Sequence, residues 1–333
     1  MSADPTQTTN ETSADAAGEP ADPLARMAEL RDRGKAPRTA STLNSWISTA
    51  QSAVGLEADR LSWLVASAVV VAALQRAVDE DGRANFLLKG GTYLQYRLGA
   101  ASRPTKDVDG IVRGDIDRFV DLLDAAIAEP WGALQLTRTE VEVINVPGKA
   151  ILPRRFNIQV TLRGDVWRRI KVEISPDEAD AAAEYDVLPA PDLKHFGIPS
   201  PDQLLGIAVR FQVAQKIHAC TDPHSPPEQK NDRARDVVDL LLLRDLIATE
   251  ATPTLGELRQ ACVAVFDARA EDARRADWTP REWPPAAVAH AHWGTDYTSA
   301  AGNGGVTLEL TDAVEALNAW ITDIDAAGEA ATQ

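Results

Sequence analysis

The chain has few cysteines, few aromatic residues and no long hydrophobic run. Only Cys220 and Cys262 occur among 333 residues, which excludes a disulfide framework and suits a reducing cytoplasm. Aromatic residues make up 5%, so the core is expected to consist of Ala, Leu and Val. The longest apolar run, Leu64 to Leu74, is too short to cross a membrane, and the N-terminus does not resemble a secretory signal. The sequence therefore predicts a cytoplasmic protein with no membrane partner.

Basic residues are also scarce and unevenly placed. The 34 Lys and Arg residues against 50 Asp and Glu residues give a net charge of -16, which argues against a general nucleic-acid binder. Seven basic residues nevertheless gather between positions 149 and 171, against the single Asp165: Lys149, Arg154, Arg155, Arg163, Arg168, Arg169 and Lys171. This excess could follow a phosphate backbone or form a solvated sheet face, and charge alone leaves both interpretations open.

Hydrophobic periodicity predicts an α+β protein in which a mixed sheet is flanked by helices. The predicted strands are 85–88, 107–112, 134–146, 155–163 and 168–174. The predicted helical segments are 23–55, 58–77, 92–98, 115–128, 201–220, 231–248, 254–267 and 308–326. The sequence thus predicts a disordered acidic tail over 1–23, a core with leading helices over 24–195 and a C-terminal helical domain over 196–333.

One local arrangement carries most of the chemical information. A short strand ends in Gly90 and Gly91, which let the backbone approach a ligand, and the helix that follows favours a phosphate at its N-terminus. Thr92 adds a hydroxyl group. Asp107 and Asp109 are two positions apart on the next strand, so they share a face and suit Mg²⁺ ions that also bind substrate phosphates. Each motif alone is usually a turn or a solvated strand end, but their joint order predicts a site for Mg²⁺ and an NTP.

Acidic and basic residues farther along the chain could complete this site. Glu173 is the candidate third acid because its strand alternates, and the alternative is a surface face shared with Lys171. In the helical half, Lys216 could contact triphosphate oxygens, and Asp236 and Asp239 share one face of the next helix. Such an acid could orient the lysine or accept a proton. Taken alone, these residues are a surface lysine and helix N-terminal acids favoured by the helix dipole.

Four ordered blocks of the sequence resemble the AbiEii-type nucleotidyltransferase toxins, which include the MenT group. They are Phe86–Thr92, Arg103–Asp109, Lys216–Ala219 and Arg235–Leu240. The resemblance covers most of residues 40–250. It implies a polymerase-beta-like nucleotidyltransferase core, a requirement for Mg²⁺, and a bacterial toxin–antitoxin or phage-defence pair with a cognate antitoxin.

The resemblance also implies a role for each matching residue. The implied metal ligands are Asp107, Asp109 and Glu173, the implied nucleotide-binding residues are Gly90, Gly91, Thr92 and Lys216, and the implied catalytic acid of the second half is Asp236. Two positions depart from the family pattern, because relatives often have serine at Gly91 and aspartate at Glu173. The region beyond about residue 250, with its tryptophans, matches nothing in the family pattern.

The favoured function is Mg²⁺-dependent transfer of a nucleoside monophosphate from an NTP to RNA, preferably a tRNA 3′ end, with inhibition of translation. One alternative changes the acceptor to a hydroxyl group of a protein or of a small molecule such as an aminoglycoside. Another is a catalytically degenerate nucleotide-binding module. A metal cluster of His218, Cys220 and His224 is disfavoured because a proline turn separates these residues and the sequence supplies no fourth ligand nearby.

Overall fold

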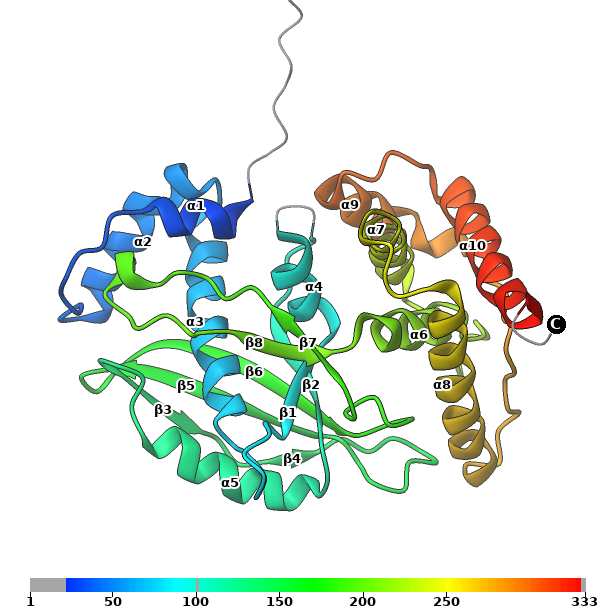
Figure 1. Ribbon diagram of the computed structural model, residues 1–333, viewed down its shortest axis with the longest axis horizontal. Coiled ribbons are helices and arrows are strands. Elements are labelled where there is room, and N and C mark those ends of the chain that lie inside the picture. Colours follow the sequence, from blue (N-terminus) through cyan, green and yellow to red (C-terminus); the bar gives the residue numbers. More distant parts are fainter. Residues whose placement is uncertain (1–21, 100–101, 331–333) are drawn as a thin grey trace, which may run out of the picture.

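The core is one mixed sheet. The computed structural model describes residues 22–99 and 102–330, so the predicted tail lies almost entirely outside the described residues. The sheet has the order β3-β5-β6-β2-β1-β8-β7, with β4 paired to β5, and its parallel pairs are β2–β6 and β1–β8 (Figure 1). The strands are β1 (Phe86–Lys89), β2 (Asp107–Val112), β3 (Leu134–Arg138), β4 (Glu142–Val143), β5 (Arg154–Leu162), β6 (Asp165–Pro176), β7 (Tyr185–Leu188) and β8 (Leu204–Ile207).

Helices from the first half of the chain pack on this sheet, except the first helix, which packs on the second. They are α1 (Pro23–Glu29), α2 (Ala40–Val54), α3 (Ala58–Gln75), α4 (Gly90–Leu98) and α5 (Ile116–Ala128). α5 is amphipathic: Phe119 and Leu123 are buried, and the Asp115 side chain caps the helix by accepting the Arg118 N–H. α3 is apolar nearly all round and would be long enough to span a bilayer, but 72% of it is buried inside the protein. It is therefore a core helix that packs against the sheet.

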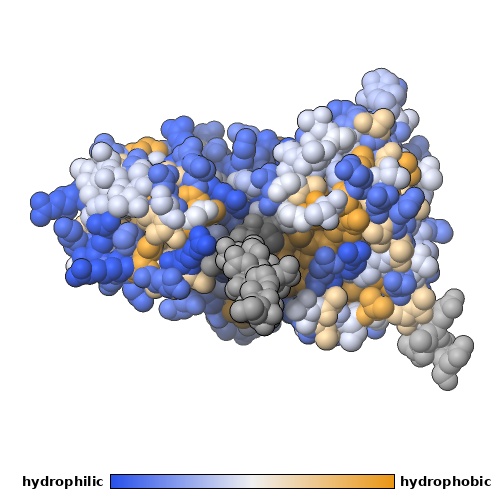
Figure 2. All heavy atoms as spheres, turned by 90° about the horizontal axis from the view of Figure 1, so that it is seen from above, coloured by the Kyte–Doolittle hydropathy of each residue, from blue (hydrophilic) through white to orange (hydrophobic). Residues whose placement is uncertain are grey.

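From residue 209 onward the chain is mostly helical and lies beside the sheet (Figure 1). Its helices are α6 (Val209–Cys220), α7 (Ala234–Glu250), α8 (Leu255–Arg275), α9 (Gly294–Gly304) and α10 (Leu310–Ala330), with the short 3-10 turn η3 (Ala291–Trp293). Another 3-10 turn, η2 (Lys194–Phe196), precedes β8 and contacts α2. α8 begins with a capping box between Thr254 and Glu257. Seen from above, hydrophobic residues are more frequent on the side of these helices than on the side of α1–α3 (Figure 2).

The structure corrects several expected elements. The predicted helix over 201–220 is wrong in its first part, because Leu204–Ile207 forms strand β8 and the helix begins at Val209. A short apolar run of this kind fits either element, and here Gly206 lets the strand pack directly against the ring of Tyr93. The core sheet thus extends past residue 195, where the helical domain was expected to begin. The predicted strand over 134–146 is two strands, and the prediction missed β7 and α9.

Candidate active site

The turn between β1 and α4 brings the backbone against an acidic side chain. Gly90 has a φ of 69°, a conformation that favours glycine, and a Cβ at this position would lie 2.8 Å from Oδ2 of Asp109. A Cβ on Gly91 would lie 3.0 Å from Oγ1 of Thr105. The two predicted glycines therefore leave room for the loop and strand that carry the carboxylates. α4 has no side-chain cap at its N-terminus, although the Gly90 N–H donates to Oε1 of Gln212 at 3.1 Å.

The three predicted acids lie together on one face of the sheet. Strand β2 runs parallel to β6, so Asp109 is paired with Glu173, and Asp107 with Lys171. Val108 and Val172 are fully buried on the opposite face, as the alternation of both strands requires. The structure thus brings Glu173 next to the carboxylate pair and puts Lys171 on the same face.

Two of the three acids are already neutralised by neighbouring cations. The Lys171 Nζ lies 3.0 Å from Asp107 Oδ2 and 3.0 Å from Glu173 Oε1. The Arg155 Nε donates to the same Glu173 oxygen at 2.8 Å. Sequence reasoning missed both cations as parts of the site, although the alternation of β6 already places Lys171 beside Glu173. The acids and these cations together form a nearly charge-balanced surface.

Asp109 differs from its neighbours because its carboxylate accepts no hydrogen bond and makes no ion pair with any residue in the described ranges. Burial, and then the negative charge of Asp107, raise the pKa of Asp109 to about 6. Lys89 is the residue on β1 paired directly with Asp109, and the Lys89 Nζ donates to Oγ of Ser175 at 2.7 Å. Burial also lowers the pKa of Lys89. A partly buried carboxylate without a direct hydrogen-bond or ion-pair partner is typical of a ligand or metal site.

The carboxylates fit a divalent cation only in part as they stand. Within residues 22–99 and 102–330, no three His, Cys, Asp or Glu side chains are gathered closely enough to hold a metal ion. The ammonium group of Lys171 lies between two of the candidate ligands, Asp107 and Glu173. Asp107 and Asp109 share a face and repel each other, so a cation between them would relieve an unfavourable charge. The donor set therefore suits a hard divalent cation held mainly by these two aspartates.

Thr92 has a different position from the one expected of a nucleotide ligand. Its side chain is fully buried, and its hydroxyl donates to the backbone carbonyl oxygen of Asp107 at 2.5 Å. This bond ties the first turn of α4 to the start of β2. Thr92 thus positions the aspartate strand relative to the glycine turn, and its hydroxyl is not directed at a ligand.

The residues predicted in the helical half form a buried cluster between α6 and α7. The Lys216 Nζ donates to Asp236 Oδ1 and to Asp239 Oδ2, each at 2.7 Å. Burial opposes the charge on Lys216, but the two carboxylates outweigh it and raise the Lys216 pKa. Burial alone would raise the pKa of Asp236, yet the Lys216 charge holds it below its usual value. Lys216 and Asp236 are therefore both ionised, and Asp236 orients the lysine.

Arg103 connects this cluster to the glycine turn. Its Nη2 donates to Asp239 Oδ2 at 3.2 Å, and a Cβ on Gly91 would lie 3.7 Å from its Nη1. Gln212, one helical turn before Lys216 on α6, bonds the Gly90 N–H. The two halves of the predicted site are thus in direct contact. The sequence analysis gives Arg103 and Gln212 no role. The one sequence feature that could have indicated Arg103 is its place in the Arg103–Asp109 block.

The basic span 149–171 is largely neutralised by acids from distant parts of the chain. Five of its seven basic residues make ion pairs: Lys149 with Glu178 and Asp272, Arg154 with Asp117, Arg155 with Glu173, Arg168 with Asp59, and Lys171 with Asp107 and Glu173. The span is therefore not a free basic stripe, and only a small part of its charge is available to a phosphate backbone.

His218 and His224 of the disfavoured metal cluster contact different side chains. The His218 ring contacts Arg269 and Arg281, and burial together with these charges lowers the His218 pKa to about 2. His224 instead stacks on His292, with ring centroids 4.2 Å apart. The two histidines thus belong to separate groups of side chains.

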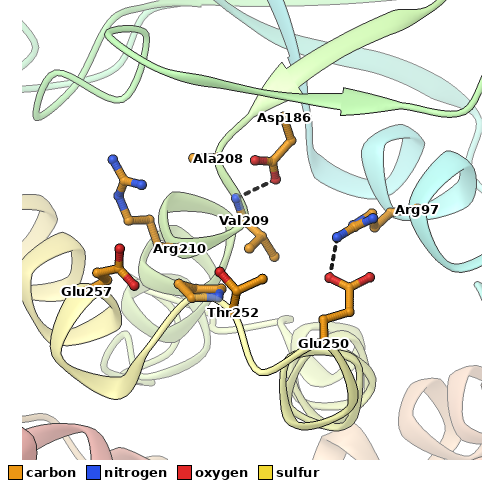
Figure 3. A pocket seen from close by; sticks show the side chains of 9 residues that line it. Arg97, Asp186, Ala208, Val209, Arg210, Glu250, Thr252 and Glu257 are labelled. Carbon is orange, nitrogen blue, oxygen red and sulfur yellow. Dashed lines mark hydrogen bonds and ion pairs between the residues drawn. The ribbon is translucent and has the colours of Figure 1, made fainter.

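A pocket of about 120 Å³ lies between α4, β7, α6 and the adjoining ends of α7 and α8 (Figure 3). Arg97 pairs with Glu250 at its wall, and Asp186 accepts the Val209 N–H and the Tyr93 hydroxyl. Its principal charged groups are thus paired within the protein. It does not include the carboxylates of the site.

The raised pKa of Asp109 predicts a pH dependence of stability. Between about pH 4 and pH 6 the folded state holds a proton that the unfolded state has released. The cost of the Asp109 charge to the folded state therefore falls by about 1 kcal/mol as the pH drops from 7 to 5. Other acids act in the opposite direction, so the quantity to measure is the difference in unfolding free energy between wild type and Asp109→Asn. We expect this difference to shift in favour of wild type at pH 5; a pH-independent difference would contradict the prediction.

Comparisons with known proteins give a matching family model and a similar solved structure. A family model described as the nucleotidyl transferase AbiEii toxin of type IV toxin–antitoxin systems matches residues 72–322, a span that contains both halves of the site. Among solved structures, the chain is similar to MenT4, a nucleotidyltransferase toxin from Mycobacterium tuberculosis H37Rv, with 18% identity and a TM-score of 0.45, over 85% of this chain and 98% of that chain. A comparison with curated proteins gives no match. Because the family model covers well over half of the chain, the resemblance seen in the sequence is confirmed, and the protein belongs to the AbiEii family of nucleotidyltransferase toxins.

Proposed function

We propose that the protein transfers a nucleoside monophosphate from an NTP to the 3′ end of an RNA, with Mg²⁺ as the metal and tRNA as the favoured acceptor. It would act in the cytoplasm, inhibit translation and be restrained by its antitoxin. The observation that carries the proposal is the position of Asp107 and Asp109 on an open sheet face beside the Gly90 turn.

The glycine turn is suited to a triphosphate. α4 begins at Gly90, whose N–H donates to Gln212, and has no side-chain cap, so the later N–H groups of its first turn and the positive end of the helix dipole would be offered to an anion. The glycines let Asp109, Thr105 and Arg103 approach this turn closely, so a phosphate held there would lie beside these side chains. We therefore assign Gly90 and Gly91 to phosphate binding and Thr92 to positioning of β2.

Asp107 and Asp109 would hold Mg²⁺. A magnesium ion bound there would neutralise triphosphate charge and polarise the reacting phosphoryl group. In the transfer, an acceptor hydroxyl oxygen bonds to the α-phosphorus, the bond to the β-phosphate oxygen breaks, pyrophosphate leaves, and the hydroxyl proton passes to solvent. Glu173 is the third acid of this face. Its ion pairs with Lys171 and Arg155 make it a weaker candidate ligand than the two aspartates.

Lys216 would contact the triphosphate with its remaining donor. An ammonium group has three N–H donors, and two of them are used by Asp236 and Asp239. Because Asp236 is held as a carboxylate by this pairing, we assign it to orienting Lys216 and not to proton transfer. Arg103 and Gln212 then connect this lysine to the glycine turn.

The surroundings of the carboxylates favour a large acceptor over an enclosed small molecule. On the site's face of the sheet, polar side chains continue away from Asp107 towards the edge: Lys171 is paired with Asn157, and Arg169 with Gln159. Arg169 is exposed and makes no ion pair with the residues that the structure describes. An open face with amide and guanidinium donors can hold the phosphates and bases of an RNA end. The overall charge of -16 favours the alternative of a protein acceptor.

The test is transfer of label from α-³²P NTPs in the presence of Mg²⁺, offered total tRNA and total protein in separate reactions. The proposal expects label on tRNA, loss of that label with Asp107→Asn, and protection of cells by the neighbouring antitoxin gene. Label on protein alone would replace the RNA acceptor with the protein alternative. No label from any NTP, together with unimpaired growth on expression, would contradict the proposal and favour the alternative of a catalytically degenerate nucleotide-binding module.

A further inference from the structure

The ammonium group of Lys171 lies at the position where the proposed reaction would need a metal ion. Its ammonium nitrogen is 3.0 Å from an oxygen of Asp107 and 3.0 Å from an oxygen of Glu173. These acids come from adjacent strands, and the lysine lies between them on the same face. Its side chain is 39% exposed, so it can move away without opening the core.

The charges around this lysine nearly balance without any metal. Asp107, Asp109 and Glu173 carry three negative charges, and the neighbouring cations are Lys171, Arg155 and Lys89. A divalent ion added to this nearly balanced group would lie a few ångströms from the ammonium of Lys171, where like charges repel strongly. A triphosphate beside the glycine turn would supply new negative charge and a new partner for the lysine.

We propose that Lys171 is a displaceable counter-ion of the metal site. It neutralises Asp107 and Glu173 in the metal-free protein, and a divalent cation binds by displacing its ammonium group. The metal therefore binds weakly to the free protein and enters together with the NTP. This inference rests on the proposed function, because it assumes that the acidic face holds a divalent ion.

The test is a titration of the full-length protein with Mn²⁺ alone, in the absence of nucleotide, followed by electron paramagnetic resonance of the free ion. Lys171→Met removes the competing charge, and we expect it to bind Mn²⁺ at least about tenfold more tightly than wild type. Lys171→Gln serves as a second variant that retains polarity. Lys171→Arg keeps the charge and is expected to stay weak.

Arg169→Met is the matched control. Arg169 lies two residues before Lys171 on the same face of β6, is exposed, and makes no ion pair among the described residues. Its replacement removes the same formal charge from the same face without touching the acids. We expect its Mn²⁺ affinity to stay within about twofold of wild type, because an exposed charge at that distance is screened by salt.

Thermal unfolding gives a readout that does not depend on activity. Without metal, Lys171→Met leaves Asp107 and Glu173 less compensated and is expected to melt below wild type. Added Mn²⁺ should raise its melting temperature more than that of wild type. Equal Mn²⁺ affinities of wild type and Lys171→Met, or weaker binding by the variant, would overturn the counter-ion role while leaving nucleotidyl transfer intact. A wild-type protein that binds no Mn²⁺ even with NTP and transfers no label would instead overturn the proposed function and this inference with it.

Discussion

Replacing Asp109 by asparagine is expected to lower nucleotidyl transfer by about a thousandfold or more and to leave the protein at least as stable as wild type. The carboxylate is partly buried beside Asp107 and lacks a hydrogen-bond or ion-pair partner among the described residues, so its charge is costly to the folded state. An amide of the same shape removes that cost at neutral pH. We expect a gain on the order of 1–3 kcal/mol in the free energy of unfolding, measured by denaturant titration in EDTA.

Asp107→Asn is the matched comparison for this prediction. Asp107 receives the Lys171 ammonium at 3.0 Å and a hydrogen bond from the Thr105 hydroxyl at 3.3 Å, so its charge is compensated. We therefore expect this variant to lose activity as severely as Asp109→Asn and to gain no stability. Wild-type transfer by Asp109→Asn would remove the aspartate from the proposed metal site. A loss of stability in that variant would show that its carboxylate has a partner in solution.

The part of the candidate site's geometry that follows from the sequence is local. Gly90 and Gly91 follow directly after a strand, and Asp107 and Asp109 alternate on the next one, so spacing alone puts both aspartates on a shared face. Alternation also puts Glu173 opposite Val172, and the parallel pairing of β2 with β6 then brings it beside Asp109. These features depend on backbone periodicity over a few residues. For the same reason the α+β class and most of the helices were predictable.

The part that the sequence does not predict depends on partners far apart in the chain. The span 149–171 has a basic composition, but Arg168 meets Asp59 and Lys149 meets Asp272, and no local pattern indicates such pairs. The sequence predicts a helix where strand β8 lies because four apolar residues fit both elements. Pairing with β1 makes this segment a strand. Thr92 has the residue type of a ligand. Only the position of the Asp107 carbonyl shows that its hydroxyl is already bonded.

Replacing Lys216 by methionine is expected to produce the largest loss of stability of any change in the site. Its ammonium group lies between Asp236 and Asp239, and both of these carboxylates are buried. Without the lysine, Arg103 remains as the cation close to Asp239, and Asp236 keeps one ion pair among the described residues, with the exposed Arg233 at 4.0 Å. Breaking a buried ion pair by removing one member costs about 3–5 kcal/mol. Denaturant unfolding of Lys216→Met should show this loss, and transfer activity should be lost as well.

A double variant separates the two roles of Lys216. In Lys216→Met combined with Asp236→Asn, the remaining charges are Arg103 and Asp239, which still form their ion pair at 3.2 Å, so the buried cluster is neutral again. We expect the double variant to recover most of the lost unfolding free energy, because replacing a buried ion pair by neutral groups costs little. Its transfer activity should stay at the level of the single variant, because the ammonium that would contact the triphosphate is still missing. Recovery of both stability and transfer would show that Lys216 only supports the fold, and the triphosphate contact would then have to come from another cation at the glycine turn, with Arg103 the nearest candidate.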